Sequence, residues 1–182
     1  MRYRRVRIEG ATYFFTLVTH QRRPLFSDSH IVALLDEAIG KIHARHPFEI
    51  AAQVVLPDHL HALWRLPDGD ADFSKRWRLI KEAFTRAYVK CRGVPEPTGL
   101  RRDKGEQAVW QRRFWEHLIR DERDFAAHVD YIHLNPVHHG LVCAPRDWPH
   151  STFRKWVERG AYEPTWGSDV KPQLPEWAKR HE

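Results

Sequence analysis

The sequence predicts an α+β fold built around one hydrophobic core, and three observations support this prediction. The chain has 182 residues, which is long enough for one core of ordinary size. Apolar residues make up 42% of the chain and charged residues 30%, which is typical of a globular protein rather than a disordered one. Segments rich in β-branched and aromatic residues are interspersed with segments whose apolar residues recur at helical spacing.

The first part of the chain contains one predicted helix among three predicted strands. The run TYFFTLVT predicts a strand that starts at Thr12. Apolar residues at spacings of three and four then predict a helix over residues 29–46. The runs FEIAAQVVL and HLHALWRL predict two more strands, and the Pro57-Asp58 pair between them indicates a tight antiparallel connection.

The second part of the chain contains two predicted helices and one more strand. A basic helix is expected over residues 73–91 and a strand over residues 109–119. A last helix is expected over residues 121–134, and we expect Pro136 to end it because a pre-proline residue is pushed out of the α region. Up to the fourth strand, this is the order of a ferredoxin-like split βαβ fold. Such a fold has an antiparallel sheet with helices on one face, which leaves the other face for a ligand.

The domain organisation is expected to be simple. We predict a main domain over residues 1–144, with a basic N-terminal arm, and a tail rich in Trp and Pro over residues 145–182. Cys91 and Cys143 are too few for a disulfide framework. The N-terminus lacks the apolar segment of a signal peptide, and no apolar stretch is long enough to cross a membrane. A soluble, cytoplasmic protein without a membrane partner is therefore expected.

The charge and the aromatic content indicate a polyanionic partner. The formal net charge is +6, and the chain contains eight tryptophans. Aromatic side chains interleaved with Arg and Lys suit the binding of unstacked bases. The alternative is that basic residues are only solvated and that several tryptophans fill the core.

The first candidate site is the histidine pair in the third predicted strand. Residues two apart in a strand point to the same side, so His59 and His61 project side by side while Leu60 points into the core. Two neutral imidazoles on one face form half of a site for a divalent metal. The alternative is chance, because the chain contains 13 histidines and one such pair could simply be exposed.

The second candidate site is one stripe of the last predicted helix. Asp124, His128, Tyr131 and Asn135 fall on this stripe, with His138 near its end, opposite an apolar stripe. Tyr131 and Asn135 are one helical turn apart, so a metal held at Asn135 would lie beside the tyrosine hydroxyl. The alternative for Tyr131 alone is an amphipathic surface tyrosine.

These motifs carry a family resemblance. His59-Leu60-His61 resembles the His-hydrophobic-His signature of HUH nucleases, and Tyr131 stands where single-tyrosine transposases of that superfamily keep their nucleophile. The strings VLPDHLHALW, VWQRRFWEHLIRDERDFAAHVDYIHLNPV and DWPHSTFRKW resemble REP-associated tyrosine transposases. The resemblance runs from Tyr3 to about Trp156. It implies a metal-dependent endonuclease and strand transferase that acts on single-stranded or hairpin DNA of the palindromic REP type.

The resemblance also implies roles for individual residues. His59 and His61 would bind the metal, with Asn135 as the third ligand. Tyr131, on a catalytic helix after the fourth strand, would be the nucleophile and would form a 5′-phosphotyrosine intermediate. The metal would be Mg²⁺ or Mn²⁺; two imidazoles and an amide are softer ligands than the carboxylates typical of Mg²⁺ sites. No nucleotide cofactor is expected, and the oligomeric state stays open.

Proton transfer and DNA binding involve further candidates. His128 or His138 could handle the phenolic proton, but a surface histidine with other partners is the favoured alternative for both. The residues expected to contact DNA are basic or aromatic: Arg4, Arg5, Lys75, Arg76, Arg78, Lys81, Arg101, Arg102, Lys104, Arg112, Arg113, Trp110 and Trp115. For each basic residue, a solvated surface charge is the alternative, and core burial is expected for at least one tryptophan.

Two other functions remain open from the sequence. The chain could be a hairpin-binding module whose catalytic use has lapsed, although both histidines and the tyrosine are present. It could also be a metal-dependent hydrolase of RNA or small phosphates, in which Tyr131 would be incidental.

Overall fold

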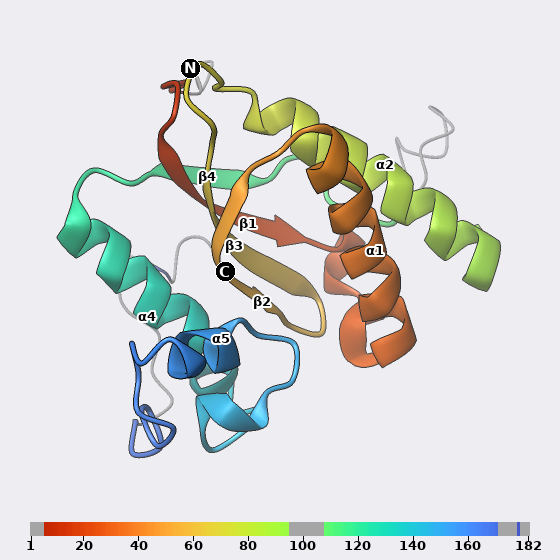
Figure 1. The fold of residues 1–182 in the computed structure, drawn as a ribbon. Helices are drawn as coiled ribbons and strands as arrows, with labels where there is room; N and C mark the ends of the chain where they lie inside the picture. Colours follow the sequence, from red (N-terminus) through yellow and green to blue (C-terminus); the bar gives the residue numbers. More distant parts are fainter. Residues whose placement is uncertain (1–5, 95–107, 171–177, 179–182) are drawn as a thin grey trace.

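A four-stranded antiparallel sheet forms the centre of the molecule (Figure 1). The computed structural model describes residues 6–94, 108–170 and 178. The strands are β1 (Thr12–Val18), β2 (Glu49–Val55), β3 (His59–Arg65) and β4 (Trp115–Leu118). Their order in the sheet is β2-β3-β1-β4, and every neighbouring pair is antiparallel. The α+β prediction and the ferredoxin-like element order are confirmed.

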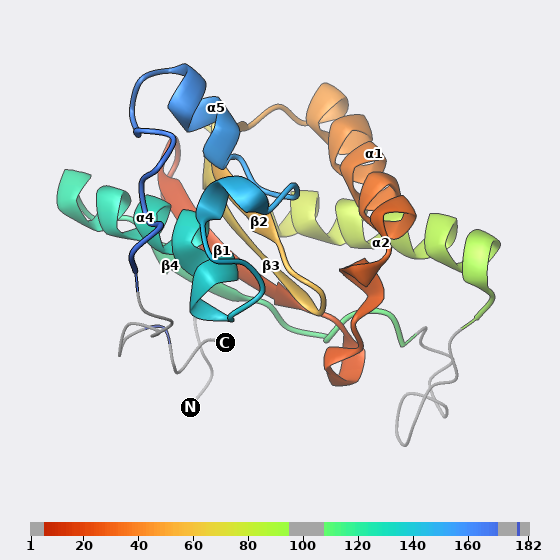
Figure 2. The same ribbon diagram turned by 90° about the horizontal axis from the view of Figure 1, so that it is seen from below.

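Helices α1 (Ser29–Arg45) and α2 (Phe73–Arg92) cover one face of the sheet (Figures 1 and 2). The side chains that point to this face from β1 and β3 are apolar, as strand alternation requires. Trp64 from β3 stacks on Trp77 from α2 with ring centroids 3.9 Å apart, and both are fully buried. This layer is a closed aromatic core.

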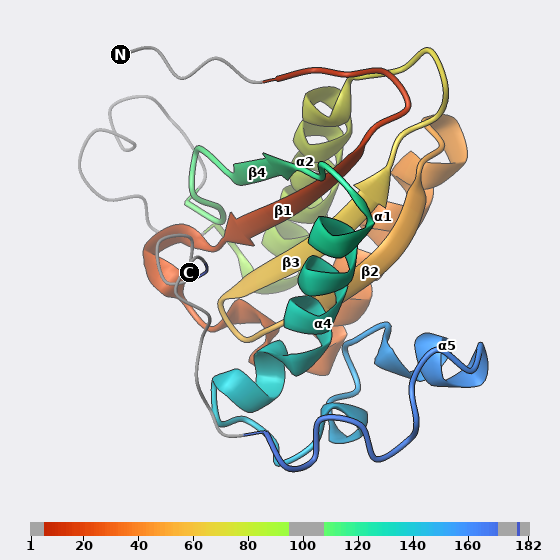
Figure 3. The ribbon, with the colours of Figure 1, turned by 90° about the vertical axis from the view of Figure 1, so that its left-hand side faces the viewer.

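Helix α4 (Glu122–His138) covers the opposite face (Figure 3). Its residues Val129 and Ile132 pack in one buried cluster with Phe14 of β1 and Leu63 of β3. The prediction that helices pack on one face is correct for α1 and α2, but α4 occupies the face that we expected to be open. The reason is its own apolar stripe, which must be buried against another element.

Two element boundaries differ from the sequence prediction. β4 starts only at Trp115, because Trp110 turns into the core against Phe26 and Phe84 and makes a single bridge to Thr19. The expected helix end before Pro136 is wrong, since α4 continues to His138. Pro136 and its neighbours on both sides are buried, so their packing outweighs the cost of a proline inside a helix.

The segment after residue 144 packs on the edge strand β2 and on α4. Ser151 bridges Val54, and the indole N–H of Trp156 donates to the Ala51 carbonyl at 2.8 Å. A short helix, α5 (Phe153–Glu158), follows the bridge. The described part of the predicted tail therefore shields an edge that would otherwise leave backbone groups unpaired. Within the described residues, no helix has the length and apolar character needed to span a membrane.

Candidate active site

The histidine pair of β3 lies between the sheet and α4. His59 and His61 are each 1% exposed, and their ring centroids are 4.9 Å apart. Leu60, between them, points into the core on the other face. The side-by-side projection predicted from strand alternation is therefore present, but the pair is buried rather than exposed.

Each imidazole is oriented by a partner on its Nδ1 atom. His59 Nδ1 lies 2.6 Å from Asp58 Oδ1, and His61 Nδ1 lies 3.0 Å from the hydroxyl of Thr16 on β1. Asp58 also accepts a hydrogen bond from Arg22 at 2.9 Å. Burial of the Asp58 carboxyl opposes its ionisation, but the hydrogen bonds from His59 and Arg22 outweigh this effect and bring its pKa to about 2. Such outer partners fix the ring orientation of a metal-binding histidine and leave Nε2 as the ligand atom.

Tyr131 reaches the histidine pair from α4. Its hydroxyl lies 3.4 Å from His61 Nε2, and its ring is tilted against the His61 ring at a centroid distance of 5.2 Å. The side chain is 3% exposed and contacts Phe14 edge-on. Tyr131 thus meets the histidine pair on the face of the sheet that α4 covers, although Tyr131 and His61 are 70 residues apart in the sequence.

Three further residues lie in the C-terminal part of α4 and just beyond it. Asn135 is fully buried one turn beyond Tyr131, and its role as a metal ligand stays a prediction. The His138 ring lies 6.2 Å from the Tyr131 ring, and burial lowers the pKa of His138. His139, which the sequence reasoning did not single out, lies with its ring centroid 5.3 Å from that of His59. Desolvation, and then the nearby His59 and His61, lower the pKa of His139 to about 4.

His128, the other predicted proton handler, is directed toward β4. Its Nδ1 lies 2.8 Å from the Asp124 carbonyl and 3.2 Å from the Asp124 carboxylate. Burial lowers its pKa. The Tyr131 hydroxyl contacts the imidazole of His61. A role for His128 in proton transfer stays a prediction.

The donor set fits the predicted divalent metal. His59 and His61 would contribute imidazole nitrogens, and Asn135 would contribute an amide oxygen, a combination that suits Mn²⁺ or another transition ion better than Mg²⁺. Both rings have their Nδ1 atoms engaged by oxygen partners, as in known metal-binding histidines.

Arg76 and Trp110, two of the residues predicted to contact DNA, are buried in the structure. Arg76 is 3% exposed, and its five N–H groups donate to the Asp70 carboxylate and to backbone carbonyls of the fold. Its guanidinium is therefore fully engaged within the fold, in an ion pair with the half-buried Asp70. Trp110 is 5% exposed and packs in the core against Phe84, so its ring is not a platform for bases.

The other predicted contacts divide into three groups. Lys75, Arg78, Arg112 and Arg113 are exposed, although Arg78 pairs with Glu82 at 2.9 Å. Lys81 is half-buried and donates to the Gln111 carbonyl, and Trp115 is half-buried on the α4 face. The remaining predicted contacts lie outside the described residues: Arg4, Arg5, Arg101, Arg102 and Lys104.

Comparison with known proteins identifies the class that this fold and site define. The family described as "Transposase IS200 like" matches residues 7–135. The chain is 46% identical over 168 residues to the "REP-associated tyrosine transposase" of Escherichia coli (strain K12), which covers 92% of each protein. A solved structure described as the REP-associated tyrosine transposase bound to a REP hairpin is similar to it with a TM-score of 0.78. That structure has 43% sequence identity, and the match covers 96% of this chain and 98% of the other.

The chain therefore belongs to the IS200-like transposases, and within them to the REP-associated tyrosine transposases. The resemblance drawn from the sequence motifs is confirmed, as is the prediction that the chain is an enzyme.

Proposed function

We propose that this protein cleaves and rejoins single-stranded DNA of REP-type hairpins, with Tyr131 as the nucleophile. The observation that carries the proposal is the contact between the buried Tyr131 hydroxyl and His61 Nε2, 3.4 Å apart. A relative with 43% identity is described as bound to a REP hairpin, which supports the same kind of DNA for this chain.

The metal would be held by His59 and His61, with Asn135 as the third ligand. Asp58 and Thr16 support this assignment, because their bonds to Nδ1 direct the Nε2 side of each ring toward α4. A divalent ion bound there would neutralise the scissile phosphate and orient it for in-line attack.

Tyr131 would form the covalent bond to DNA. A phenol with an ordinary pKa near 10 is a weak nucleophile at neutral pH and must lose its proton as it attacks. The phenolic oxygen forms a bond to phosphorus, the bond from phosphorus to the 3′-oxygen breaks, and that oxygen takes up a proton. The products are a 5′-phosphotyrosine and a free 3′-hydroxyl. The 3′-hydroxyl of another strand reverses the same step, so rejoining needs no nucleotide cofactor.

Several exposed cations would hold the DNA backbone, and those on α2 lie on the opposite side of the sheet from Tyr131. Lys75 and Arg78 lie in the first turns of α2, and Arg112 and Arg113 precede β4. Trp115 lies on the same face of the sheet as Tyr131 and packs edge-on against Phe14. Its partly exposed ring would stack on an unpaired base next to the cleaved phosphate.

The proposal is tested by incubating the protein with a labelled REP-type hairpin that carries a single-stranded flank, in Mn²⁺ and in Mg²⁺. We expect a covalent protein–DNA adduct that survives denaturation and is lost in Tyr131→Phe. Tyr88→Phe is the matched control, since Tyr88 is a half-buried tyrosine on α2, and it should retain the adduct.

The other outcomes distinguish the alternative functions. Cleavage that persists in Tyr131→Phe would favour the metal-dependent hydrolase. Tight binding without any cleavage by the wild-type protein would favour the lapsed binding module. A double His59→Ala/His61→Ala variant should bind the hairpin and fail to cut it.

A further inference from the structure

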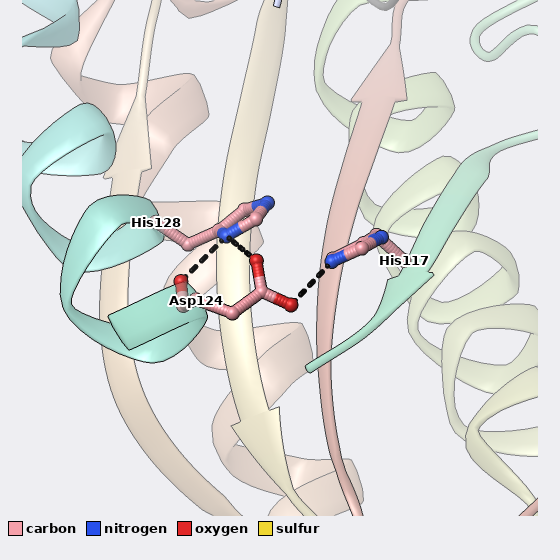
Figure 4. Close-up of side chains that lie close together, drawn as sticks. All are labelled: His117, Asp124 and His128. Carbon is pink, nitrogen blue, oxygen red and sulfur yellow. Dashed lines mark hydrogen bonds and ion pairs between the residues drawn. The ribbon is translucent and has the colours of Figure 1, made fainter. Parts of the chain in front are cut away.

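A second group of metal-ligating side chains lies between β4 and α4, apart from the His59 and His61 pair (Figure 4). His117 comes from β4, and Asp124 and His128 come from α4. One donor atom from each residue lies within 4.8 Å of the others. Because Asp124 and His128 are four residues apart, they share one face of the helix and point together toward the strand.

Each imidazole lies near a different oxygen of the Asp124 carboxylate, at close to the spacing between two ligands of a small tetrahedral ion. His117 Nε2 lies 2.9 Å from Asp124 Oδ2, and His128 Nδ1 lies 3.2 Å from Asp124 Oδ1. Zinc binds such ligands at about 2.0–2.2 Å, so tetrahedral ligand atoms lie roughly 3.4 Å apart. The rings of His117 and His128 are nearly parallel, with centroids 4.7 Å apart, which brings both imidazoles to the same carboxylate.

The cluster is held firmly but remains accessible. The side chains of Asp124 and His128 are 8% and 6% exposed, and that of His117 is 25% exposed. They line a pocket of about 510 Å³ together with Trp115, Arg120 and Arg123. Arg120 donates to Asp124 Oδ2 from its backbone N–H and from its exposed guanidinium. The guanidinium can move aside when an ion approaches, while the backbone bond keeps the carboxylate in place. The pocket supplies an entry path and room for a water as the fourth ligand.

We propose that His117, Asp124 and His128 form a second metal site. It binds one Zn²⁺ or a similar transition-metal ion with three protein ligands and an open fourth position. Two imidazoles and one carboxylate are the ligand types that such an ion prefers. Coordination replaces the hydrogen bonds of the triad: the His117 ring proton moves from Nε2 to Nδ1, the His128 ring proton moves from Nδ1 to Nε2, and His128 Nδ1 gives up its bond to the Asp124 carbonyl.

The proposed second metal site is separate from the proposed catalytic site, but packing contacts and the shared helix α4 link the two. The Phe14 ring lies between them, with centroid distances of 4.9 Å to His128 and 5.3 Å to His61. Tyr131 follows His128 by three residues on the same helix. An ion at the second site would cross-link β4 to α4 and so fix the helix segment that carries Tyr131.

The test uses the full chain with the first histidine pair removed. The His59→Ala/His61→Ala variant is dialysed against Zn²⁺ and, separately, titrated with Co²⁺, whose absorption spectrum reports tetrahedral nitrogen and oxygen ligands. We expect one tightly bound equivalent and the tetrahedral Co²⁺ spectrum. Adding His117→Ala should remove both signals. Because neither measurement requires DNA cleavage, a failure of the proposed nuclease activity would not affect the result.

Two matched variants separate ligation from folding. Asp124→Asn, in the same background, keeps the size of the side chain and should also lose the bound ion while the circular dichroism spectrum is retained. His30→Ala removes an exposed histidine on α1 and should leave the stoichiometry at one. The proposal is overturned if the double variant binds no ion, or if the bound equivalent survives both His117→Ala and Asp124→Asn.

Discussion

The two faces of the sheet are built from the same strands but have different chemistry. On the face covered by α1 and α2, β3 contributes Leu60, Ala62 and Trp64 to an apolar, aromatic core. On the face covered by α4, the alternate residues His59 and His61 stand opposite Tyr131. A period of two thus lets one strand stabilise the fold on one side and hold a reactive site on the other.

Several polar side chains on the face covered by α4 are paired with one another. Thr16 bonds to His61, Asp58 bonds to His59, and Asp124 bonds to His117 and His128. Unpaired polar groups in such a layer would cost free energy of folding. Stability and site geometry can therefore be disturbed separately, and four experiments test this separation.

The largest expected effect is a loss of stability when a buried residue on the face covered by α1 and α2 is truncated. Trp77→Ala should lower the free energy of unfolding by about 3–5 kcal/mol, because Trp77 is fully buried against Trp64. Trp115→Ala, on the α4 face, should lower it less because part of the Trp115 ring is already in solvent. Urea unfolding measures both values. Equal losses would mean that the two faces contribute alike.

The second-largest effect is expected on metal affinity, when a residue on the face covered by α4 is changed. Asp58→Asn should weaken Mn²⁺ binding by about 10–100-fold, because the amide holds the His59 ring less strongly than the carboxylate does. Asp68→Asn, at an exposed position after the same strand, is the control and should bind Mn²⁺ normally. Isothermal titration calorimetry measures the affinity. An unchanged affinity in Asp58→Asn would remove Asp58 from the site.

A third effect concerns the pH dependence of stability that His133 of α4 causes. His133 is fully buried, and burial lowers its pKa to about 3. As the pH falls below the ordinary value near 6.5, the unfolded state takes up a proton while the folded state stays neutral. The stability is therefore complete above pH 6.5 and is lost toward pH 3, by up to about 1.4 kcal/mol per pH unit.

His133→Gln should flatten this dependence, whereas His30→Gln, at an exposed site, should not. Urea unfolding at several pH values between 3 and 7 provides the measurement. If the wild-type protein and His133→Gln lose stability in parallel, His133 does not remain neutral in the folded state.

The smallest expected effect is on DNA affinity. Lys75→Gln removes one exposed cation from the start of α2. The slope of log K against log salt for hairpin binding should become shallower by about 1, which corresponds to one lost phosphate contact. Lys41→Gln, on α1, removes an exposed cation paired with Glu37 and should leave the slope unchanged. A slope unchanged in both variants would exclude Lys75 from the DNA-binding surface.

The sequence predicted the parts of this protein that depend on local periodicity. Alternation along β3 placed His59 and His61 on one side, and helical spacing put Tyr131 and Asn135 on one stripe of α4. The order of strands and helices was sufficient for the fold class.

The sequence could not predict what depends on contacts between distant segments. The pairing of Thr16 with His61 follows from strand register, and the burial of Arg76 depends on an acidic partner in the preceding loop. Helix α4 continues beyond Pro136 because of packing contacts that a local sequence pattern does not show. Only the position of Asp58 next to His59 gave a local signal for an orienting partner, and the sequence reasoning did not use it.

Tyr131 is identified as the nucleophile by locating the DNA on the protein. The adduct formed by the wild-type protein can be digested with nuclease and trypsin, and the modified peptide identified by mass spectrometry. Residues 124–146 form one tryptic peptide, in which Tyr131 is the only tyrosine. We expect a nucleotide phosphate on Tyr131 of this peptide. A nucleotide phosphate on any other residue would contradict the account.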